Sequence, residues 1–324
     1  MATVLTVTLG PSVDTWTTTE RLVPQAKLRC TAPVHHPGGG GINVARVLHR
    51  LGTDVLALHV ASGPTGAALA SLLAQEHLPV LAVAGSGETR RAWTVAESST
   101  GKEYRFVPPG PALPASAIAA VTGHLADMRP APSMVVLSGS LPAGCDTGLY
   151  ARLASVARDR GCKVALDASG PALAEALACG VDLVKPSLQE LRELVQAPLA
   201  TMQECVAACR SLLARGSAST VALTLGGQGA MLVTRDMALH APAVDVAVAG
   251  TVGAGDSFLA GLVHEMLRGR AMDEALRTAA ACAAATVLHT GTSLCDVGDV
   301  ERLRPRVRVV SVQEGRGPGF RARG

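Results

Sequence analysis

A glycine-rich stretch with a single acidic residue is the strongest chemical signal in the sequence. It reads Gly-Thr-Val-Gly-Ala-Gly-Asp-Ser-Phe over residues 250–258 and opens a helical pattern over residues 257–267. Glycines let backbone amides point at a ligand, and the positive end of a helix attracts anions, so the stretch predicts a phosphoryl-binding site. A carboxylate repels phosphate, so Asp256 is better suited to accept the proton of an attacking hydroxyl. Taken alone, the stretch fits equally well a strand-to-helix turn with Asp256 as the N-cap.

A run of four glycines at residues 38–41 is the second signal. A helical pattern over residues 42–51 follows it and ends at Gly52, a typical residue just beyond a helix C-terminus. Ordering four glycines is entropically unfavourable, so the run needs a reason. Close approach of the backbone to a ligand supplies one and a flexible hinge another, and the two are compatible.

The remainder of the chain alternates strand and helix patterns. Strands are predicted at residues 3–9, 23–33, 54–60, 79–83, 134–137, 163–166, 183–184, 220–224 and 244–248. Helices are predicted at residues 42–51, 66–76, 115–128, 147–160, 171–179, 201–214, 257–267 and, as a buried segment, 278–288. Repeated strand–helix units indicate an α/β fold with a doubly wound, mostly parallel sheet flanked by helices. Such folds bind ligands at the carboxyl ends of their strands.

Three charged residues near the N-terminus are candidate substrate ligands. Asp14 follows the first predicted strand after a break at residues 11–14, where it can bind substrate hydroxyls, although a turn aspartate is the plainer interpretation. Lys27 and Arg29 are two positions apart in the predicted strand 23–33 and would point to one face. Two cations on one face suit a sugar phosphate, and a solvated strand edge is the alternative.

A predicted β-hairpin over residues 89–107 concentrates aromatic residues in a chain that is only 2% aromatic. It carries Trp93, Tyr104 and Phe106, which can cover a substrate or a second subunit. We expect residues of about 17–36 and 87–108 to form a small β-sheet lid on a single α/β domain of residues 1–312. The glycine- and arginine-rich residues 313–324 are expected to form a disordered tail.

The bulk composition argues against several functional classes. A net charge of +3 without a basic, aromatic-interleaved stripe disfavours nucleic-acid binding. No apolar run reaches the length of a membrane span, and no signal-peptide pattern is visible at the N-terminus. The eight cysteines lack zinc-site spacing and fit reduced thiols of a cytoplasmic protein. Neither a P-loop nor a strand leading into Gly-x-Gly-x-x-Gly occurs.

Together, the two glycine-rich stretches resemble the signatures of the ribokinase-like (phosphofructokinase B) carbohydrate kinases. Residues 37–45 resemble the first signature, and residues 251–258 resemble the second, an anion hole with a catalytic aspartate. Their order and separation also match, and the resemblance covers roughly residues 1–300. It implies a ribokinase-like fold, ATP-dependent phosphoryl transfer with Mg²⁺, a monovalent cation such as K⁺ near the anion hole, and a homodimer joined through the lid.

A narrower resemblance concerns the sugar. Residues 27–34, 104–107, 138–142 and 183–186 resemble the 6-phosphofructokinase branch, which implies phosphorylation of fructose 6-phosphate to fructose 1,6-bisphosphate. The 1-phosphofructokinases and tagatose-6-phosphate kinases are the alternatives. A non-catalytic sugar-phosphate sensor is the alternative from another class, and the presence of Asp256 and both glycine stretches counts against it.

The resemblance also implies a role for each matching residue. Asp256 is the implied base, and the amides of Gly253, Ala254 and Gly255 stabilise the transferring phosphoryl group. The sugar hydroxyls are expected to bind Asp14, Gly39 and Asn43. The substrate's phosphate is expected to bind Lys27, Arg90 and Ser140, with Arg29 close to Lys27. The nucleotide is expected to bind Lys185, Ser187, Thr224, Gly226 and Gly229.

One position departs from the family pattern. The family usually has Asn-x-x-Glu after Lys-Pro, a pair tied to the water network of magnesium and phosphate. Here Ser187 takes the place of asparagine, while Glu190 remains as the implied magnesium residue, acting through water. A serine hydroxyl is shorter and cannot offer an amide and a carbonyl together. We therefore expect weaker metal or phosphate handling with activity retained.

Overall fold

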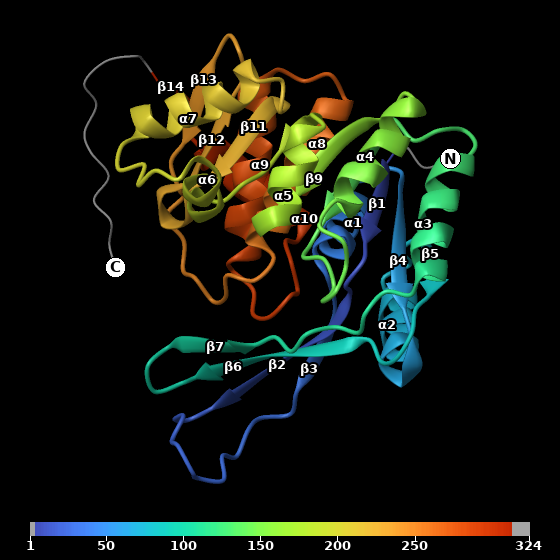
Figure 1. Cartoon of the computed structure of the whole chain (residues 1–324). Helices are drawn as coiled ribbons and strands as arrows, with labels where there is room; N and C mark the ends of the chain where they lie inside the picture. The colour runs from blue at the N-terminus through green and yellow to red at the C-terminus, as the bar shows by residue number, and fades with distance from the viewer. Residues whose placement is uncertain (1–3, 313–324) are drawn as a thin grey trace.

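The computed structural model describes residues 4–312, and its strands form two sheets (Figure 1). The larger sheet has ten strands, in the spatial order β14 (Val310–Ser311), β13 (Ala238–Ala241), β12 (Ala230–Val233), β11 (Ala218–Thr224), β10 (Val181–Val184), β9 (Lys163–Asp167), β8 (Met134–Ser138), β1 (Val4–Thr8), β4 (Val55–Ala61) and β5 (Val80–Ala84). Neighbours run parallel from β11 to β5, whereas β12, β13 and β14 continue the sheet antiparallel. The expected mostly parallel sheet is confirmed.

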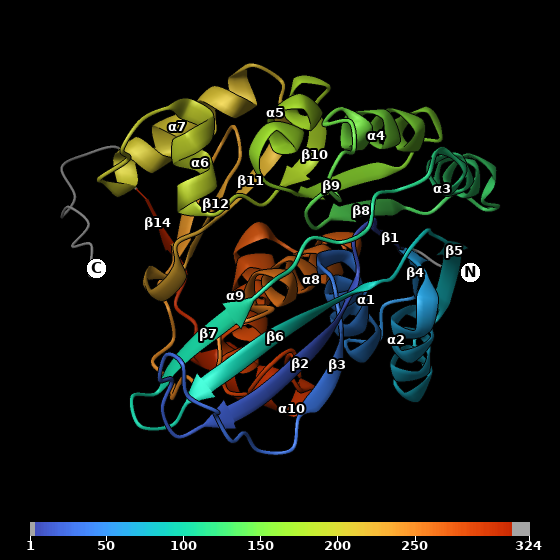
Figure 2. The same cartoon turned by 60° about the horizontal axis from the view of Figure 1, so that its bottom comes forward.

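Helices cover both faces of this sheet (Figure 2). One face carries α3 (Ala115–Asp127), α4 (Leu149–Asp159), α5 (Gly170–Ala178), α6 (Leu188–Val195) and α7 (Met202–Ala214). The other carries α1 (Gly40–Arg50), α2 (Gly63–Gln75), α8 (Ala254–Leu267), α9 (Met272–Thr286) and α10 (Val297–Leu303). Two short 3₁₀ turns, η1 (Gly226–Gln228) and η2 (Arg304–Arg306), complete the helical segments of the described chain. No helix within residues 4–312 is long and apolar enough to cross a bilayer.

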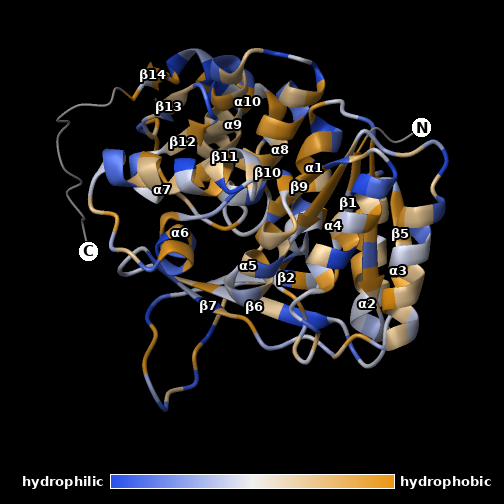
Figure 3. Cartoon of the chain, turned by 45° about the horizontal axis from the view of Figure 1, so that its top comes forward, coloured by the Kyte–Doolittle hydropathy of each residue, from blue (hydrophilic) through white to orange (hydrophobic). Residues whose placement is uncertain are grey.

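The central strands are apolar on both sides because both sides are covered. In β1, Leu5 and Val7 pack toward one helical layer and Val4 toward the other. Figure 3 shows strands of the large sheet, such as β5, as largely hydrophobic. Because β1, β8, β9 and β10 run parallel, their carboxyl ends lie along one edge of the sheet, where polar residues follow each strand.

The smaller sheet lies apart from the first, along the lower edge of Figure 1. Its strands, in the spatial order of the sheet, are β3 (Val34–Gly38), β2 (Ser12–Thr19), β6 (Arg90–Glu97) and β7 (Lys102–Phe106). The β6–β7 hairpin is the one predicted, with Gly101 at φ 70° in its turn.

The two faces of the small sheet differ in chemistry. Register and alternation place Asp14, Trp16, Arg90 and Arg105 on one face, which we call the inner face. Trp16 packs against Gly291, in the loop after α9, so this face looks toward the large sheet and its helices. Trp93, Tyr104 and Phe106 lie on the opposite, outer face and are 40%, 38% and 54% exposed.

Two predicted strands are wrong. Residues 23–33 form no strand, because the strongly β-branched segment just before them, Ser12–Thr19, takes the place in the small sheet. Asp14 consequently lies inside β2 rather than at the end of β1. Residues 244–248 also form no strand. Their alternating valines, of which Val244 and Val246 are half-buried and Val248 is exposed, line a cavity instead of pairing with a neighbouring strand. The sequence prediction also missed β2, β3, β12, β13, β14, α6 and α10. The predicted tail at residues 313–324 lies outside the described residues.

Candidate active site

The glycine-rich stretch that predicts a phosphoryl site forms the N-terminus of α8. Gly253 is the N-cap, with a φ of 83°, and no side chain caps the helix, so the interpretation of Asp256 as N-cap is wrong. A Cβ on Gly253 would lie 2.4 Å from Cδ2 of Leu294, so steric space and backbone conformation both require glycine here. The first amides of a helix lack partners within it, and its dipole is positive at this end. This helix end can therefore hold an anion.

Asp256 lies in the first turn of α8 and contacts the other glycine signature. Asn43, near the start of α1, donates a hydrogen bond from Nδ2 to Oδ2 of Asp256 over 2.8 Å. The packing of α1 beside α8 thus brings together two segments that are far apart in the sequence.

The surroundings of Asp256 make it a weaker acid than an ordinary aspartic acid. Burial and the negative charge of Asp167 raise its pKa to about 7, although Asn43, Lys185 and Arg105 oppose the shift. A carboxyl group with a pKa near neutrality is suited to accept and release a proton during turnover.

Lys185 lies beside the anion site. Its ammonium group is buried and forms an ion pair of 3.0 Å with Asp167, at the end of the neighbouring strand β9. Burial disfavours its charge, yet attraction to Asp167, Asp256 and Glu190 raises its pKa above the ordinary value. A Cβ on Gly255 would lie 3.5 Å from Nζ of Lys185, so the cation sits against the first turn of α8. A negatively charged phosphoryl group at this turn would meet both.

The four-glycine run is explained by close packing. An added Cβ would lie 2.3 Å from Asp14 Oδ1 at Gly38, 2.7 Å from Thr8 Cγ2 at Gly39, 2.4 Å from Ser138 Oγ at Gly40, and 2.5 Å from Thr8 Oγ1 at Gly41. Gly39 also has a φ of 116°. The run therefore lets α1 begin directly on the ends of β1 and β8. It also places Gly38 against the carboxylate of Asp14, whose Oδ1 accepts a 2.6 Å hydrogen bond from Ser12.

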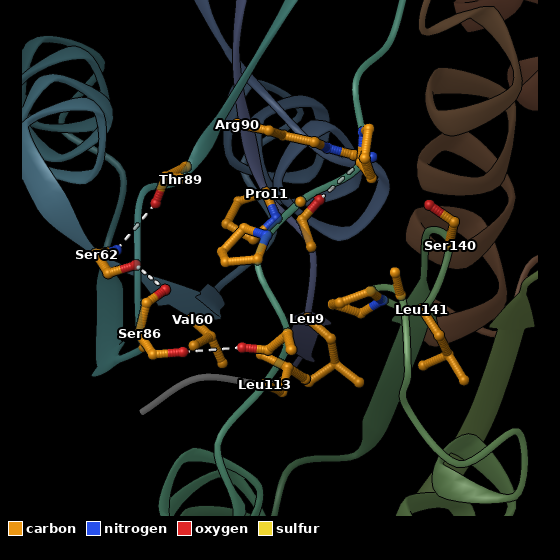
Figure 4. A pocket seen from close by; sticks show the side chains of 18 residues that line it. Leu9, Pro11, Val60, Ser62, Ser86, Thr89, Arg90, Leu113, Ser140 and Leu141 are labelled. Carbon is orange, nitrogen blue, oxygen red and sulfur yellow. Dashed lines mark hydrogen bonds between the residues drawn. The ribbon is translucent and has the colours of Figure 1, made fainter.

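Arg90 and Ser140 line one cavity of about 220 Å³ (Figure 4). Arg90 crosses one end of it and donates from Nη2 to the carbonyl of Gly10 over 3.1 Å. Its Nε is buried and has no hydrogen-bond partner among residues 4–312. Apolar side chains, such as Val60 and Leu113, form the other end. The planar guanidinium of Arg90 borders this cavity, and such a group suits a ligand phosphate.

A second cavity of about 910 Å³ borders the anion site. Its lining includes four of the five predicted nucleotide residues, Ser187, Thr224, Gly226 and Gly229, but not Lys185. It also includes Ala254 and Gly255 of the anion site. Apolar residues of α9 and of the segment 244–248 form much of the remaining wall. Its volume accommodates a ligand of nucleotide size, and its inner end opens on the start of α8.

Ser187 and Glu190 form a capping box at the start of α6. The hydroxyl of Ser187 accepts from the Glu190 amide at 3.2 Å, and Oε2 of Glu190 accepts from the Ser187 amide at 2.7 Å. Serine is as good an N-cap as asparagine. Ser187, which departs from the family pattern, thus serves as an N-cap, a role that asparagine could also fill. The hydrogen bond from its amide fixes the orientation of the Glu190 carboxylate.

Lys27 and Arg29 are not brought to either cavity. Both are exposed on the segment between β2 and β3, which is not a strand, so the argument that they share one face fails. Two other residues near Asp256 have no predicted role. Asp167 follows the strand-end pattern and could have been found by it. Arg105 could be found only from the register of the hairpin, which places it on the inner face with Arg90.

Comparisons with known proteins agree with this geometry. The model of the pfkB family carbohydrate kinases matches residues 5–297. An ATP-dependent 6-phosphofructokinase isozyme 2 of Mycobacterium tuberculosis is 39% identical over 299 residues, covering 92% of this chain and 88% of the relative. A 1-phosphofructokinase of Xanthomonas campestris is 34% identical over 307 residues, covering 93% of each.

The solved structures of Escherichia coli phosphofructokinase-2 superpose closely on this fold. The complex with fructose-6-phosphate has a TM-score of 0.89 at 36% identity, covering 94% of this chain and 99% of that one. A complex with potassium has the same TM-score at 37% identity and the same coverage. The ribokinase-like fold expected from the sequence is thus confirmed.

Proposed function

The chain belongs to the pfkB family of carbohydrate kinases, and from this premise we propose that it phosphorylates fructose 6-phosphate to fructose 1,6-bisphosphate with ATP. The observation that carries the proposal is the placement of Asp256. It lies bonded to Asn43, at the helix end that also borders the large cavity. A base, an anion site and a nucleotide-sized cavity thus meet at one point.

In the proposed reaction Asp256 accepts the proton of the attacking sugar hydroxyl. The amides of Gly253, Ala254 and Gly255 and the charge of Lys185 stabilise the phosphoryl group as it moves in line from ATP to that hydroxyl. Asp14, Gly39 and Asn43 hold the sugar hydroxyls. Asn43 stabilises the ionised form of Asp256 by its hydrogen bond.

The substrate's own phosphate is proposed to bind Arg90 and Ser140. The planar guanidinium of Arg90, which borders the cavity, favours a phosphate oxygen. Lys27 and Arg29 join this site only if the segment between β2 and β3 moves or a second subunit supplies them.

ATP is proposed to occupy the large cavity, with Ser187, Thr224, Gly226 and Gly229 along it. Mg²⁺, when bound with ATP, supplies positive charge to the phosphates. Within residues 4–312 no group of three His, Cys, Asp or Glu side chains is placed to hold a metal directly. Glu190 fits a role through water, because the Ser187 amide orients its carboxylate. A K⁺ ion near the anion hole is supported by the potassium complex of the E. coli enzyme.

The small sheet is proposed to act as a lid and as the surface of a homodimer in the cytoplasm. Its inner face carries Asp14 and Arg90, while its outer face exposes Trp93, Tyr104 and Phe106. Exposed aromatic residues of this kind mark a protein interface. Replacing Trp93 and Phe106 by aspartate should therefore yield a monomer in size-exclusion chromatography with light scattering. A wild-type protein that is already monomeric at micromolar concentration contradicts this part.

ADP release with Mg-ATP tests the function. We expect fructose 6-phosphate to give a kcat/KM at least tenfold above that of fructose 1-phosphate, tagatose 6-phosphate or fructose. Asp256→Asn should lower kcat by about 10²–10⁴-fold while ATP binding is retained. A preference for fructose 1-phosphate would make the chain a 1-phosphofructokinase on the same mechanism. ATP binding without turnover of any sugar would contradict the kinase proposal.

A further inference from the structure

Arg46 is buried next to the proposed active site without touching either cavity. It lies on α1, three residues after Asn43, and its side chain is 1% exposed. Nε and Nη2 bind the carboxylate of Glu76 at distances of 2.6–3.0 Å. A buried charge needs such a partner, but the ion pair with Glu76 does not account for the third nitrogen.

The third nitrogen, Nη1, joins three separate segments. Its two hydrogens are shared among three acceptors: the carbonyl of Thr292 at 2.9 Å, the carbonyl of Pro37 at 3.1 Å and, in the longest of the three contacts, Oδ1 of Asn43 at 3.4 Å. Pro37 precedes the glycine run, and Thr292 lies in the loop after α9 that packs on the small sheet. A single guanidinium thus holds the glycine run, the loop and the amide that contacts Asp256.

The geometry points to Arg46 as a positioning residue that sets the orientation of the Asn43 amide and, through it, the proton affinity of Asp256. A guanidinium only donates hydrogen bonds, and a carboxylate only accepts them. With Arg46 on one side and Asp256 on the other, only one orientation of the amide satisfies both. Oδ1 must face Arg46, and Nδ2 must face Asp256. This inference rests on the proposed role of Asp256 as the base.

Arg50 provides a matched control. It lies one turn further along α1, binds the same Glu76 carboxylate at 3.1 Å, and donates to the carbonyls of Ser293 and Cys295. Like Arg46, it therefore pairs with Glu76 and bonds to the loop after α9, but within residues 4–312 it makes no hydrogen bond with Asn43.

The test is the pH profile of kcat/KM for Arg46→Lys, Glu76→Gln and Arg50→Lys. The groups that face Asp256 are Asp167, Lys185, Arg105 and Asn43, and all of them are left intact. Arg46→Lys should move the acid limb to higher pH by about one unit, because loss of the Asn43 donor disfavours the carboxylate. Glu76→Gln releases Arg46 and should shift the limb in the same direction by less. Arg50→Lys should leave it in place.

An Asn43→Ala background provides the second readout. If Arg46 acts through Asn43, Arg46→Lys adds no further shift there. Equal losses of Tm for Arg46→Lys and Arg50→Lys with superimposable pH profiles would reduce Arg46 to a structural role and overturn the inference. If Arg46→Lys does not fold, Glu76→Gln against Arg50→Lys decides. The proposed role of Asp256 as the base fails separately, by a fully active Asp256→Asn, and the proposed kinase function fails by ATP binding without turnover of any sugar.

Discussion

Asp167 and Lys185 form a buried ion pair of 3.0 Å at the ends of neighbouring strands, and the two charges act on Asp256 in opposite directions. The carboxylate of Asp167 disfavours a second negative charge nearby, whereas the ammonium of Lys185 favours it. Together with burial, the balance leaves Asp256 poised near neutrality.

The poised carboxyl group predicts the pH dependence of turnover. In the proposed mechanism the ionised form of Asp256 is the base, and its fraction falls as the pH drops below its pKa of about 7. We expect kcat/KM to decline about tenfold per pH unit on the acid side of that value. A profile that is flat from pH 5.5 to 8 would show that Asp256 is not the titrating base.

Arg105, on the small sheet, provides a second test of the acid limb of the pH profile. Its positive charge lowers the pKa of Asp256, so Arg105→Gln should raise that pKa and shift the acid limb to higher pH. Lys102→Gln is the control, because Lys102 is exposed on the same strand with its side chain on the opposite face. Equal shifts in both variants would indicate a general effect of net charge.

Arg90→Ala tests the phosphate site. Loss of a charged partner should raise the KM for the phosphosugar by about 30-fold, equivalent to roughly 2 kcal/mol, with little change in the KM for ATP. Arg91→Ala provides the control, since Arg91 is the next residue of β6 and binds Thr65 on the other face. An unchanged KM in Arg90→Ala would place the phosphate elsewhere.

The capping box predicts how Ser187 can be changed. Ser187→Ala should lower the free energy of unfolding by about 1 kcal/mol through the lost N-cap, and it should raise the Mg²⁺ concentration needed for half-maximal rate. Ser187→Asn should preserve both. Thr201→Ala removes the equivalent capping box of α7 and should affect stability alone. If Ser187→Ala and Thr201→Ala behave alike in the Mg²⁺ titration, Glu190 has no part in metal handling.

The sequence predicts the parallel strands of the large sheet well because their signals are local, but it misses the antiparallel strands β12, β13 and β14. Apolar strands and amphipathic helices can each be recognised without knowing their neighbours. The small sheet was harder to predict, since Pro11 and Ser12 look like a break although β2 begins at Ser12. Residues 244–248 resemble a strand in sequence because every second residue is a valine. In the structure these valines line one wall of a cavity instead of one face of a sheet.

In the site, too, the residues with local sequence signals can be predicted, whereas their contacts depend on the tertiary structure. Asp256 and Asn43 stand out because they adjoin glycine runs, but their hydrogen bond depends on how α1 packs against α8. From the sequence, an arginine on an amphipathic helix is expected on its solvated face. Only the tertiary structure shows that Glu76 and the carbonyls of Pro37 and Thr292 surround Arg46.

The reach of Arg46 along the chain also bears on synthesis. Asn43 leaves the ribosome 213 residues before Asp256, and the carbonyl of Thr292 follows Arg46 by 246 residues. During translation the guanidinium of Arg46 therefore lacks its acceptor on Thr292 until nearly the whole chain has been made. The site cannot be completed before that point. A prematurely terminated chain that ends before Thr292 is therefore expected to be inactive and a target for degradation rather than a partly active kinase.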